Sequence, residues 1–385
     1  MIKFGKGVVK FRIPILILAV LLLIPAGISY LNTRVNYDIL SYLPSDIETM
    51  EGQDILLDEF GTGAFSFLIV EGMDDKDVDA LADEIDSIDH VKDVIWYGSV
   101  ADFSIPAEML PDDIYDFFNN KDADSQLMAV LYDDSMASDG TMAAIDQMTE
   151  LVGDKCYISG MASVINDIKH LSEKETPIYV GIAVILSLIV LSLTMDSALV
   201  PILFLASIGM AIVYNLGTNF VQGEISYVTQ ALAAVLQLAV TMDYSIFLWH
   251  SYQENQERFP EDNKRAMAHA ISNTITSVVG SSITTVAGFI ALCFMSFTLG
   301  LDLGVVMAKG VIFGVIGCVT ILPSLILVFD KALKKTKHRV IIPDVGKIAN
   351  WVTNHYVVFI IAFLVILGPA LYGYNHTSVY YDLAG

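Results

Sequence analysis

The sequence predicts a polytopic α-helical membrane protein, with about seven transmembrane helices and an extracytoplasmic α+β domain between the first two. The chain of 385 residues is 54% hydrophobic, yet its formal net charge is −23. Neither a soluble domain nor a simple helix bundle usually combines these two properties. The charge is segregated, because residues 32–176 hold 33 of the 44 acidic residues and only 7 basic ones.

Outside this acidic domain the chain consists of apolar runs, each long enough for the ~20 residues that a membrane helix needs. The first run lies in 1–31, where a basic start resembles a signal peptide, but its length favours an uncleaved helix. Residues 177–329 supply the second to sixth helices, and a basic stretch, 330–351, precedes the seventh. The predicted spans are 13–31, 177–195, 198–217, 226–250, 276–297, 303–329 and 352–373.

The basic residues predict the orientation of these spans. Thirteen of the 21 lie in three short segments, 1–12, 258–265 and 331–347, which all fall on one side of the membrane. By the positive-inside rule that side is cytoplasmic. We therefore expect a cell-membrane protein with a cytoplasmic N-terminus and with 32–176 outside. The single cysteine of that domain, Cys156, gives no disulfide framework.

The external domain alternates strand and helix patterns. Alternating or apolar runs predict strands, and helical spacing predicts two helices between them. The expected strands are 64–70, 90–98, 125–132 and 155–160, and the expected helices are 77–88 and 140–152. Two βαβ halves of this kind are typical of a split, ferredoxin-like domain. Residues 104–124 interrupt them as a lid, a partner contact or a plain surface loop. Residues 161–176 are helical and enter the second span without a linker.

An internal repeat relates the two ends of the chain. A shift of 344 residues places Pro25 on Pro369, Tyr30 on Tyr374, Thr33 on Thr377, Val35 on Val379, Tyr37 on Tyr381 and Asp38 on Asp382. The first span and its exit are thus repeated at 352–373 and 374–385, the latter as the start of a second external domain. Transporters built from parallel repeats hold their working site at the repeat interface.

An acidic residue interrupts the fourth span. Residues 236–250 read LQLAVTMDYSIFLWH, and Asp243 lies within this apolar run. A charged carboxylate inside a membrane costs at least a few kcal/mol. The side chains one helical turn away are apolar, so we expect its partner on another helix. Tyr244 points about 100° away and can face a different neighbour. A carboxylic acid in apolar surroundings can exchange protons at physiological pH.

Small hydroxyl residues of the fifth span lie at the depth of Asp243. Ser281, Ser282 and Thr285 either hydrate the acid or serve close helix packing, which membrane interfaces favour in any case. His250, one heptad toward the cytoplasm, either begins a proton path or is an interfacial histidine. Lys309 of the sixth span is expected to snorkel outward, toward Asp302.

Two further features of the sequence concern the basic segment after the fourth span and the absence of enzyme motifs. The spacing of apolar residues in 262–275 predicts a cytoplasmic interfacial helix. No metal-ligand spacing, nucleotide-binding loop or nucleophile triad is present. We therefore expect no enzyme activity, no cofactor and no nucleic-acid partner.

Four stretches carry a family resemblance: YDILSYLP (37–44), SGMASVINDI (159–168), TMDYS (241–245) and LGVVMAKGVIFGVIGCVTILPSLIL (303–327). With this topology, the chain resembles the N-terminal half, plus the start of the second repeat, of a transporter of the resistance-nodulation-division (RND) superfamily, in its MMPL branch. The resemblance implies proton-driven export of lipids or other hydrophobic or amphiphilic compounds through an external porter domain.

The same resemblance implies a proton relay built from Asp-Tyr pairs of the fourth and tenth spans. Asp243 and Tyr244 match the fourth-span pair, whereas the chain has no tenth span. The expected partners are membrane lipids, a hydrophobic substrate and a second transporter half, supplied by the same gene product, a second copy or another chain. Two alternatives remain: a SecDF-like accessory of protein export, and a non-transporting lipid sensor or scaffold like the sterol-sensing-domain proteins.

Overall fold

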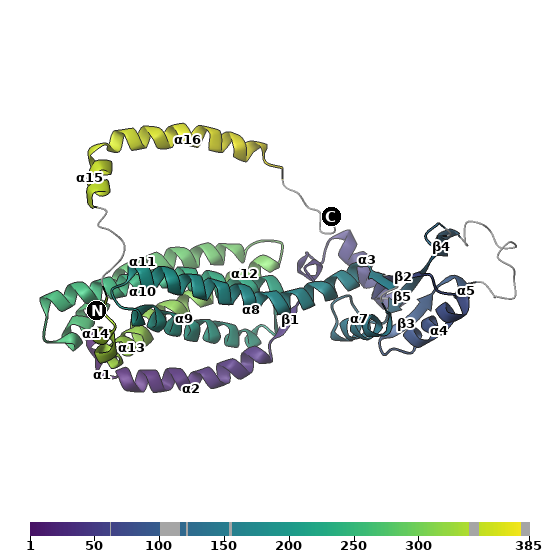
Figure 1. The fold of residues 1–385 in the computed structure, drawn as a ribbon, viewed down its shortest axis with the longest axis horizontal. Helices are drawn as coiled ribbons and strands as arrows, with labels where there is room; N and C mark the ends of the chain where they lie inside the picture. The colour runs from purple at the N-terminus through teal and green to yellow at the C-terminus, as the bar shows by residue number, and fades with distance from the viewer. Residues whose placement is uncertain (62, 101–115, 121, 154–155, 339–345, 379–385) are drawn as a thin grey trace.

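The computed structural model describes residues 1–378, except 62, 101–115, 121, 154–155 and 339–345. Seven described helices are long and apolar enough to cross a membrane, which confirms the seven predicted spans. The first six form a bundle from one end of which a globular domain projects, whereas the seventh, α16 (Tyr356–His376), lies apart from it (Figure 1). We call the end with the domain the domain end and its opposite the basic end. The helices are α2 (Arg12–Leu31), α8 (Met161–Thr194), α9 with η3 (Leu199–Val221), α10 (Tyr227–Arg258), α11 (Asn263–Leu292), α12 to α13 (Leu299–Val328) and α16 (Tyr356–His376).

The core of the bundle lies among α9, α10, α11 and α12. Phe204, Leu248 and Ile271 from three of these helices are at most 1% exposed. A short helix, α1 (Ile2–Lys10), packs against α11, and a Cβ at Gly5 would lie 2.4 Å from the Ala268 carbonyl oxygen. The two helices can approach this closely because Gly5 has no side chain.

The prediction that 262–275 forms a separate interfacial helix is wrong. These residues are the first turns of α11, which continues unbroken into the membrane span. Ala266, Met267, Ala270 and Ile271 are buried, because α1 and the bundle cover them. The apolar face that the sequence shows is therefore a packing face.

The sixth span is one path made of three segments. α12 (Leu299–Ile316) leads into a π-helical stretch, Gly317–Ile321, and then α13 (Leu322–Val328), which has Pro323 in its first turn. Proline lacks the N–H that would continue the α-helical ladder, so the preceding turn widens. A short α14 (Asp330–Lys335) follows at the basic end.

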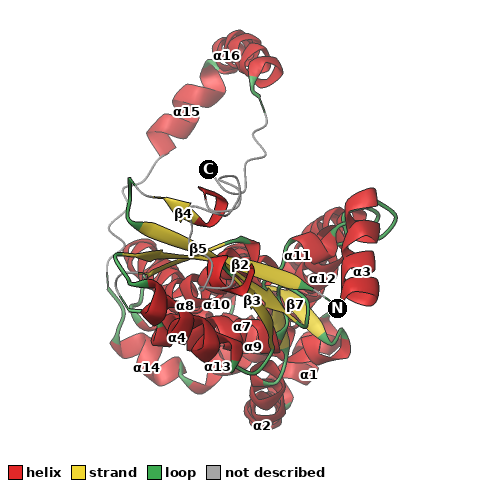
Figure 2. Cartoon of the chain, turned by 90° about the vertical axis from the view of Figure 1, so that its right-hand side faces the viewer, coloured by secondary structure: helices red, strands yellow, loops and turns green. Residues whose placement is uncertain are grey.

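The globular domain consists of one antiparallel sheet with helices packed against it (Figure 2). Its strand order is β3-β5-β2-β6, and β4 (Asn119–Asn120) also pairs with β5. β2 (Ala64–Glu71), β3 (Val91–Ile95), β5 (Ser125–Tyr132) and β6 (Cys156–Ser159) lie where the sequence predicts strands. α4 (Asp75–Asp86) and α7 (Asp139–Leu151) lie where it predicts helices. Leu68, Ile85, Met128, Val130 and Met148, each fully buried, form the domain core.

Two connections join this domain to the bundle. α8 runs without interruption from the domain into the membrane region, as the sequence predicts. β1 (Arg34–Asn36), directly after α2, pairs in parallel with β7 (Glu224–Ser226), directly before α10. The YDILSYLP stretch adds a contact, because the Tyr42 carbonyl accepts hydrogen bonds from the N–H and the hydroxyl of Thr298, each at 2.9 Å. α8, the β1–β7 pair and the Tyr42–Thr298 contact thus connect the domain and the segment before it to the membrane part of α8, to α10 and to the start of α12.

A hydrogen-bonded acid ties α7 to the start of α8. The Asp146 carboxylate accepts from Asn166 Nδ2 at 2.7 Å and lies 2.7 Å from His170 Nε2. Burial raises the pKa of Asp146, but the hydrogen bonds from Asn166 and His170 outweigh it, so the pKa lies below its ordinary value. The ionised form therefore stabilises the junction.

The two ends of the chain carry matching helices. α15 (Gly346–Asn354) and α16 are α1 and α2 displaced by 344 residues to within one residue, and Pro25 and Pro369 lie inside α2 and α16. No described residue of α15 or α16 is buried, whereas α1 and α2 pack on the bundle. Residues 104–115 and 121 of the predicted excursion, 339–345 of the linker and 379–385 of the repeat lie outside the described residues.

Gly217 and Gly209 of α9 give a matched pair of substitutions. A Cβ at Gly217 would lie 2.3 Å from the Ala26 carbonyl oxygen, whereas one at Gly209 meets nothing within 4 Å. We expect Gly217→Ala to push α2 from α9 and to lower the free energy of unfolding by about 1–3 kcal/mol. Gly209→Ala should match the wild type. Thermal unfolding in detergent tests this, and equal midpoints for both variants would contradict the packing described.

The Asp146 junction predicts a pH-dependent difference in stability. Because the folded-state pKa of Asp146 is lowered, its stabilisation is complete above its ordinary pKa of about 3.9 and is lost as pH falls through the lowered value. Asp146→Asn should therefore unfold at a lower temperature than the wild type at pH 5–7, and the difference should shrink toward pH 3. Glu150→Gln, at an exposed acid of the same helix, is the control; a pH-independent Asp146 difference would exclude this linkage.

Candidate functional site

The candidate site lies in the middle of α10. Ser226 caps this helix by accepting a hydrogen bond from the Val228 N–H, and the helix then continues for 32 residues. Asp243 lies on its exposed side, in line with Ala239 and Phe247 and, further along, His250. Among the described residues none donates a hydrogen bond to the Asp243 carboxylate, so the partner that the sequence predicts on another helix is not among them. The carboxylate lies on the bundle surface and not in its interior.

Tyr244 points the other way, as expected for the next residue of a helix. Its side chain is 3% exposed and packs in the bundle core with Leu248 and Cys318. The side chains of Ser281 and Thr285 lie beside its hydroxyl. The hydroxyl makes no hydrogen bond of good geometry to them. The serine and threonine that were expected to serve Asp243 therefore adjoin Tyr244.

The remaining predicted residues have local roles in this arrangement. Ser282 is buried and donates to the Val279 carbonyl at 3.0 Å, within its own helix. Thr285 likewise donates to the Ser281 carbonyl at 3.2 Å, which leaves its oxygen free to accept. His250 is exposed at the far end of the stripe that contains Asp243. The structure thus brings Tyr244, Ser281 and Thr285 together and leaves Asp243 and His250 on the surface.

The surface of α11 beside this stripe has an unusual composition. Its exposed residues include many with small side chains: Thr276, Ser277, Gly280, Ser281, Thr284, Ala287, Gly288 and Ala291. The exposed sides of α2, α8 and α16 carry mainly large aliphatic and aromatic residues instead. Small residues at a membrane helix surface favour close contact with another helix.

A second polar group lies inside the bundle, and the sequence analysis missed it. Asn215 of α9 donates from Nδ2 to Gln237 Oε1 of α10 at 3.0 Å, and both are at most 1% exposed. Thr241, one turn further along α10, is also buried. Cβ atoms at Gly310 and Gly314 of α12 would lie 2.6 Å from Asn215 Nδ2 and 2.5 Å from Thr241 Oγ1. We call Asn215, Gln237 and Thr241 the polar column. The signal in the sequence that could have indicated this polar column was the presence of Asn215 and Gln237 within apolar runs.

The polar column continues toward the domain end through Lys309 and Asp302 of α12. Lys309 donates to Asn219 Oδ1. Asp302 is buried and accepts from the Ser226 N–H at 2.9 Å. The side chain of Lys309 thus reaches outward, in the direction that the sequence predicts. Metal-binding groups of His, Cys, Asp or Glu are absent from the described residues.

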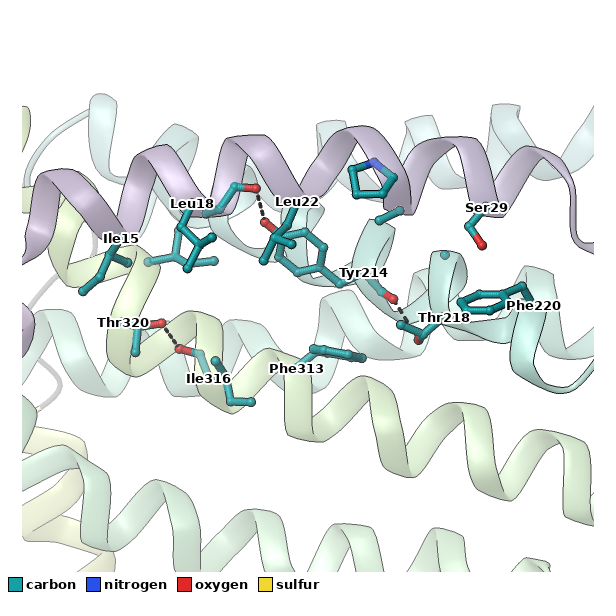
Figure 3. Close-up of a pocket in the computed structure, with 15 residues that line it drawn as sticks. Ile15, Leu18, Leu22, Ser29, Tyr214, Thr218, Phe220, Phe313, Ile316 and Thr320 are labelled. Carbon is teal, nitrogen blue, oxygen red and sulfur yellow. Dashed lines mark hydrogen bonds between the residues drawn. The ribbon is translucent and has the colours of Figure 1, made fainter.

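An apolar cavity of about 660 Å³ lies between α2, α9 and α12 (Figure 3). Leu18 and Leu22 face Tyr214, Phe313 and Ile316 across it. The Tyr214 hydroxyl donates to the Ala19 carbonyl at 2.5 Å, so it presents no free polar atom to the cavity. A volume of this size fits a small apolar ligand.

Comparison with known proteins decides the family. Residues 42–357, most of the chain, match the model of the MMPL family. The chain belongs to the MMPL family. It is 24% identical to the membrane protein MJ1562 of Methanocaldococcus jannaschii, over 83% of this chain and 91% of that protein. It is 26% identical to MmpL12 of Mycobacterium tuberculosis, named a probable transport protein, over 59% of this chain and only 20% of that one.

A solved structure of SecDF also resembles this MMPL chain. It has a TM-score of 0.43 and 13% sequence identity, and the match covers 86% of this chain and 39% of SecDF. Family membership and the seven apolar helices identify a multi-pass membrane protein and support a transporter over an enzyme.

The half-buried Tyr214 and the buried Tyr244 of this MMPL chain predict different responses to loss of the hydroxyl. Tyr214→Phe removes a hydrogen bond to the Ala19 carbonyl and should lower the free energy of unfolding by about 1 kcal/mol. Tyr244→Phe removes a buried hydroxyl that makes no hydrogen bond of good geometry, and should leave the unfolding temperature unchanged or higher. Thermal unfolding of both variants in the same detergent checks this. A larger loss for Tyr244→Phe would show that its hydroxyl is tightly bound.

Proposed function

We propose that this chain is half of a proton-motive-force-driven exporter of lipids or other hydrophobic or amphiphilic compounds, with Asp243 and Tyr244 in its proton relay. The chain would lie in the cell membrane with its N-terminus in the cytoplasm and residues 32–176 outside. The observation that carries the proposal is the position of Asp243, exposed at mid-length on a helix that is long and apolar enough to span a membrane.

The exposure of Asp243 supports a second transporter half. An ionised carboxylate that faces hydrocarbon costs several kcal/mol, and such residues normally face protein or a water-filled cavity. The small side chains exposed along α11 provide an adjacent surface for close helix contact. A second half that packs on α10 and α11 would cover both features and place its own polar groups opposite Asp243. It could come from the same gene product, a second copy or another chain.

In the proposed relay, Tyr244 lies on the side of α10 opposite Asp243 and faces the bundle. Its hydroxyl points into the bundle beside Ser281 and Thr285, while Asp243 points out of it. A proton that binds Asp243 removes its charge, and the two charge states favour different surroundings. Moving one charge across the membrane potential provides about 2.3 kcal/mol per 100 mV, which is sufficient to bias a two-state rearrangement of helices.

The external domain would convert this rearrangement into export. The element order β2-α4-β3-β5-α7-β6, with its antiparallel sheet, fits the split βαβ pattern, and we assign it as the porter domain. α8 and the β1–β7 pair connect it to the helices that carry the relay. The apolar cavity between α2, α9 and α12 suits a hydrophobic cargo.

A SecDF-like role in protein export and a lipid-sensing scaffold are the alternative functions. The MmpL12 relative, named a probable transport protein, supports export by this chain over a scaffold. A scaffold would not need a carboxylate in the membrane, so the response to loss of Asp243 distinguishes it from a pump.

Asp243→Asn provides the test, because it keeps the shape of the side chain and removes its charge and its titration. We expect it to abolish both the efflux of a hydrophobic dye, Nile red, from cells and proton uptake into proteoliposomes, measured with the pH indicator pyranine. Its abundance and unfolding temperature should stay at the wild-type values. Glu254→Gln, at an exposed acid of the same helix, is the matched control and should retain both activities. Full efflux by Asp243→Asn would exclude the proposed relay.

A further inference from the structure

A hollow at the basic end of the bundle gathers positive charge. The cavity, of about 840 Å³, lies between α1 and the first turns of α11. Five basic side chains line it: Lys6, Lys10, Arg12, Lys264 and Arg265. The protein as a whole carries a net charge of −23. We call these five residues the basic hollow.

The walls of the basic hollow are fixed by contacts of the backbone and of neighbouring side chains. Gly5 holds α1 against α11 through its approach to Ala268. The guanidinium of Arg265 stacks 4.4 Å from the centre of the Phe259 ring. The Arg12 guanidinium donates from Nη1 to the Val9 carbonyl at 3.1 Å. Two of the cations are therefore held in place.

Acidic groups do not neutralise the hollow. Among the described residues, Asp262 is the one acid that lines it, and it caps α11 by accepting from the Arg265 N–H at 2.9 Å. Glu261 and Asp330 line a smaller adjoining cavity, shared with Arg12 and Lys264. Within the described residues, none of the five cations forms an ion pair within 4.0 Å, whereas Lys334 pairs with Asp330 at 3.0 Å and Lys337 with Asp196 at 3.4 Å.

We propose that the basic hollow binds the phosphate headgroup of an anionic phospholipid. Lys and Arg that share a concave surface attract a phosphate, and basic pockets beside membrane helices suit such headgroups. Ile2 and Val9 add apolar surface to the hollow. Directly beyond Arg12, the exposed side chains of Ile13, Ile17 and Leu18 on α2 provide a surface for the acyl chains. That apolar continuation favours a lipid over free phosphate.

The positive-inside rule explains why basic residues lie at this end, but it does not explain the hollow. The rule applies equally to Lys331 and Lys335 of α14, which lie at the same end and line none of the cavities described. A headgroup site requires that cations around the cavity contribute more than cations on α14. The proposal is independent of Asp243 and of the direction or cargo of transport.

The test compares two double variants that remove the same charge: Lys6→Gln/Lys264→Gln in the hollow and Lys331→Gln/Lys335→Gln on α14. Each full-length protein in non-ionic detergent is titrated with phosphatidylglycerol, and the apparent dissociation constant is taken from the rise in unfolding temperature. We expect phosphatidylglycerol, but not phosphatidylcholine, to stabilise the wild type. The hollow variant should bind about tenfold more weakly, and the α14 variant should stay within about twofold of wild type. Lys6→Arg/Lys264→Arg should restore binding.

Three results would overturn the proposal. Equal weakening by both double variants would mean attraction to diffuse positive charge. Stabilisation by inorganic phosphate at the same concentration would mean a free-anion site without a lipid requirement. No stabilisation of the wild type by phosphatidylglycerol would mean that the hollow binds no such headgroup.

Discussion

The poor solvation of charge by hydrocarbon is the constraint on which this structure depends. It explains why Lys309 donates to Asn219 near the domain end and why Asn215 and Gln237 pair inside the bundle. Asp243 is the exception, exposed at mid-length of α10. Among the described acidic and basic residues of the spans, the others are partly or fully buried or lie toward the ends, so Asp243 marks the surface on which we propose that a second transporter half packs.

Glycine and polar residues together set the interior of the bundle. Gly310 and Gly314 let α12 approach Asn215 and Thr241 so closely that a methyl group at either position would overlap them. The polar column therefore packs against backbone and not against large side chains. It ends two residues before Asp243, so the buried polar interior and the exposed acid are neighbours along one helix, on opposite sides of it.

The sequence predicted the seven spans and the positions of the domain strands, because length and apolar periodicity are visible in one dimension. It also singled out Asp243 as an acid within an apolar run, and the role of this residue stays a prediction. It did not predict which residues of α10 face the bundle and which face outward. The sequence predicts a partner for Asp243 on another helix, and it predicts that Ser281 and Thr285 either hydrate the acid or serve helix packing; in the structure Asp243 is exposed and Ser281 and Thr285 adjoin Tyr244. The apolar pattern of 262–275 predicts a membrane-surface face, because the contact with α1 depends on tertiary packing.

The length of α8 has a mechanical consequence. A helix of 34 residues is about 51 Å long, so a 5° tilt about one end moves the other by roughly 4 Å. A small rearrangement in the membrane that tilts α8 by this angle would therefore move its domain end by about the size of a side chain. Pro177 lies midway along α8 and cannot donate to the Glu173 carbonyl, so one backbone hydrogen bond is missing there and the helix bends more easily at this point than elsewhere along its length.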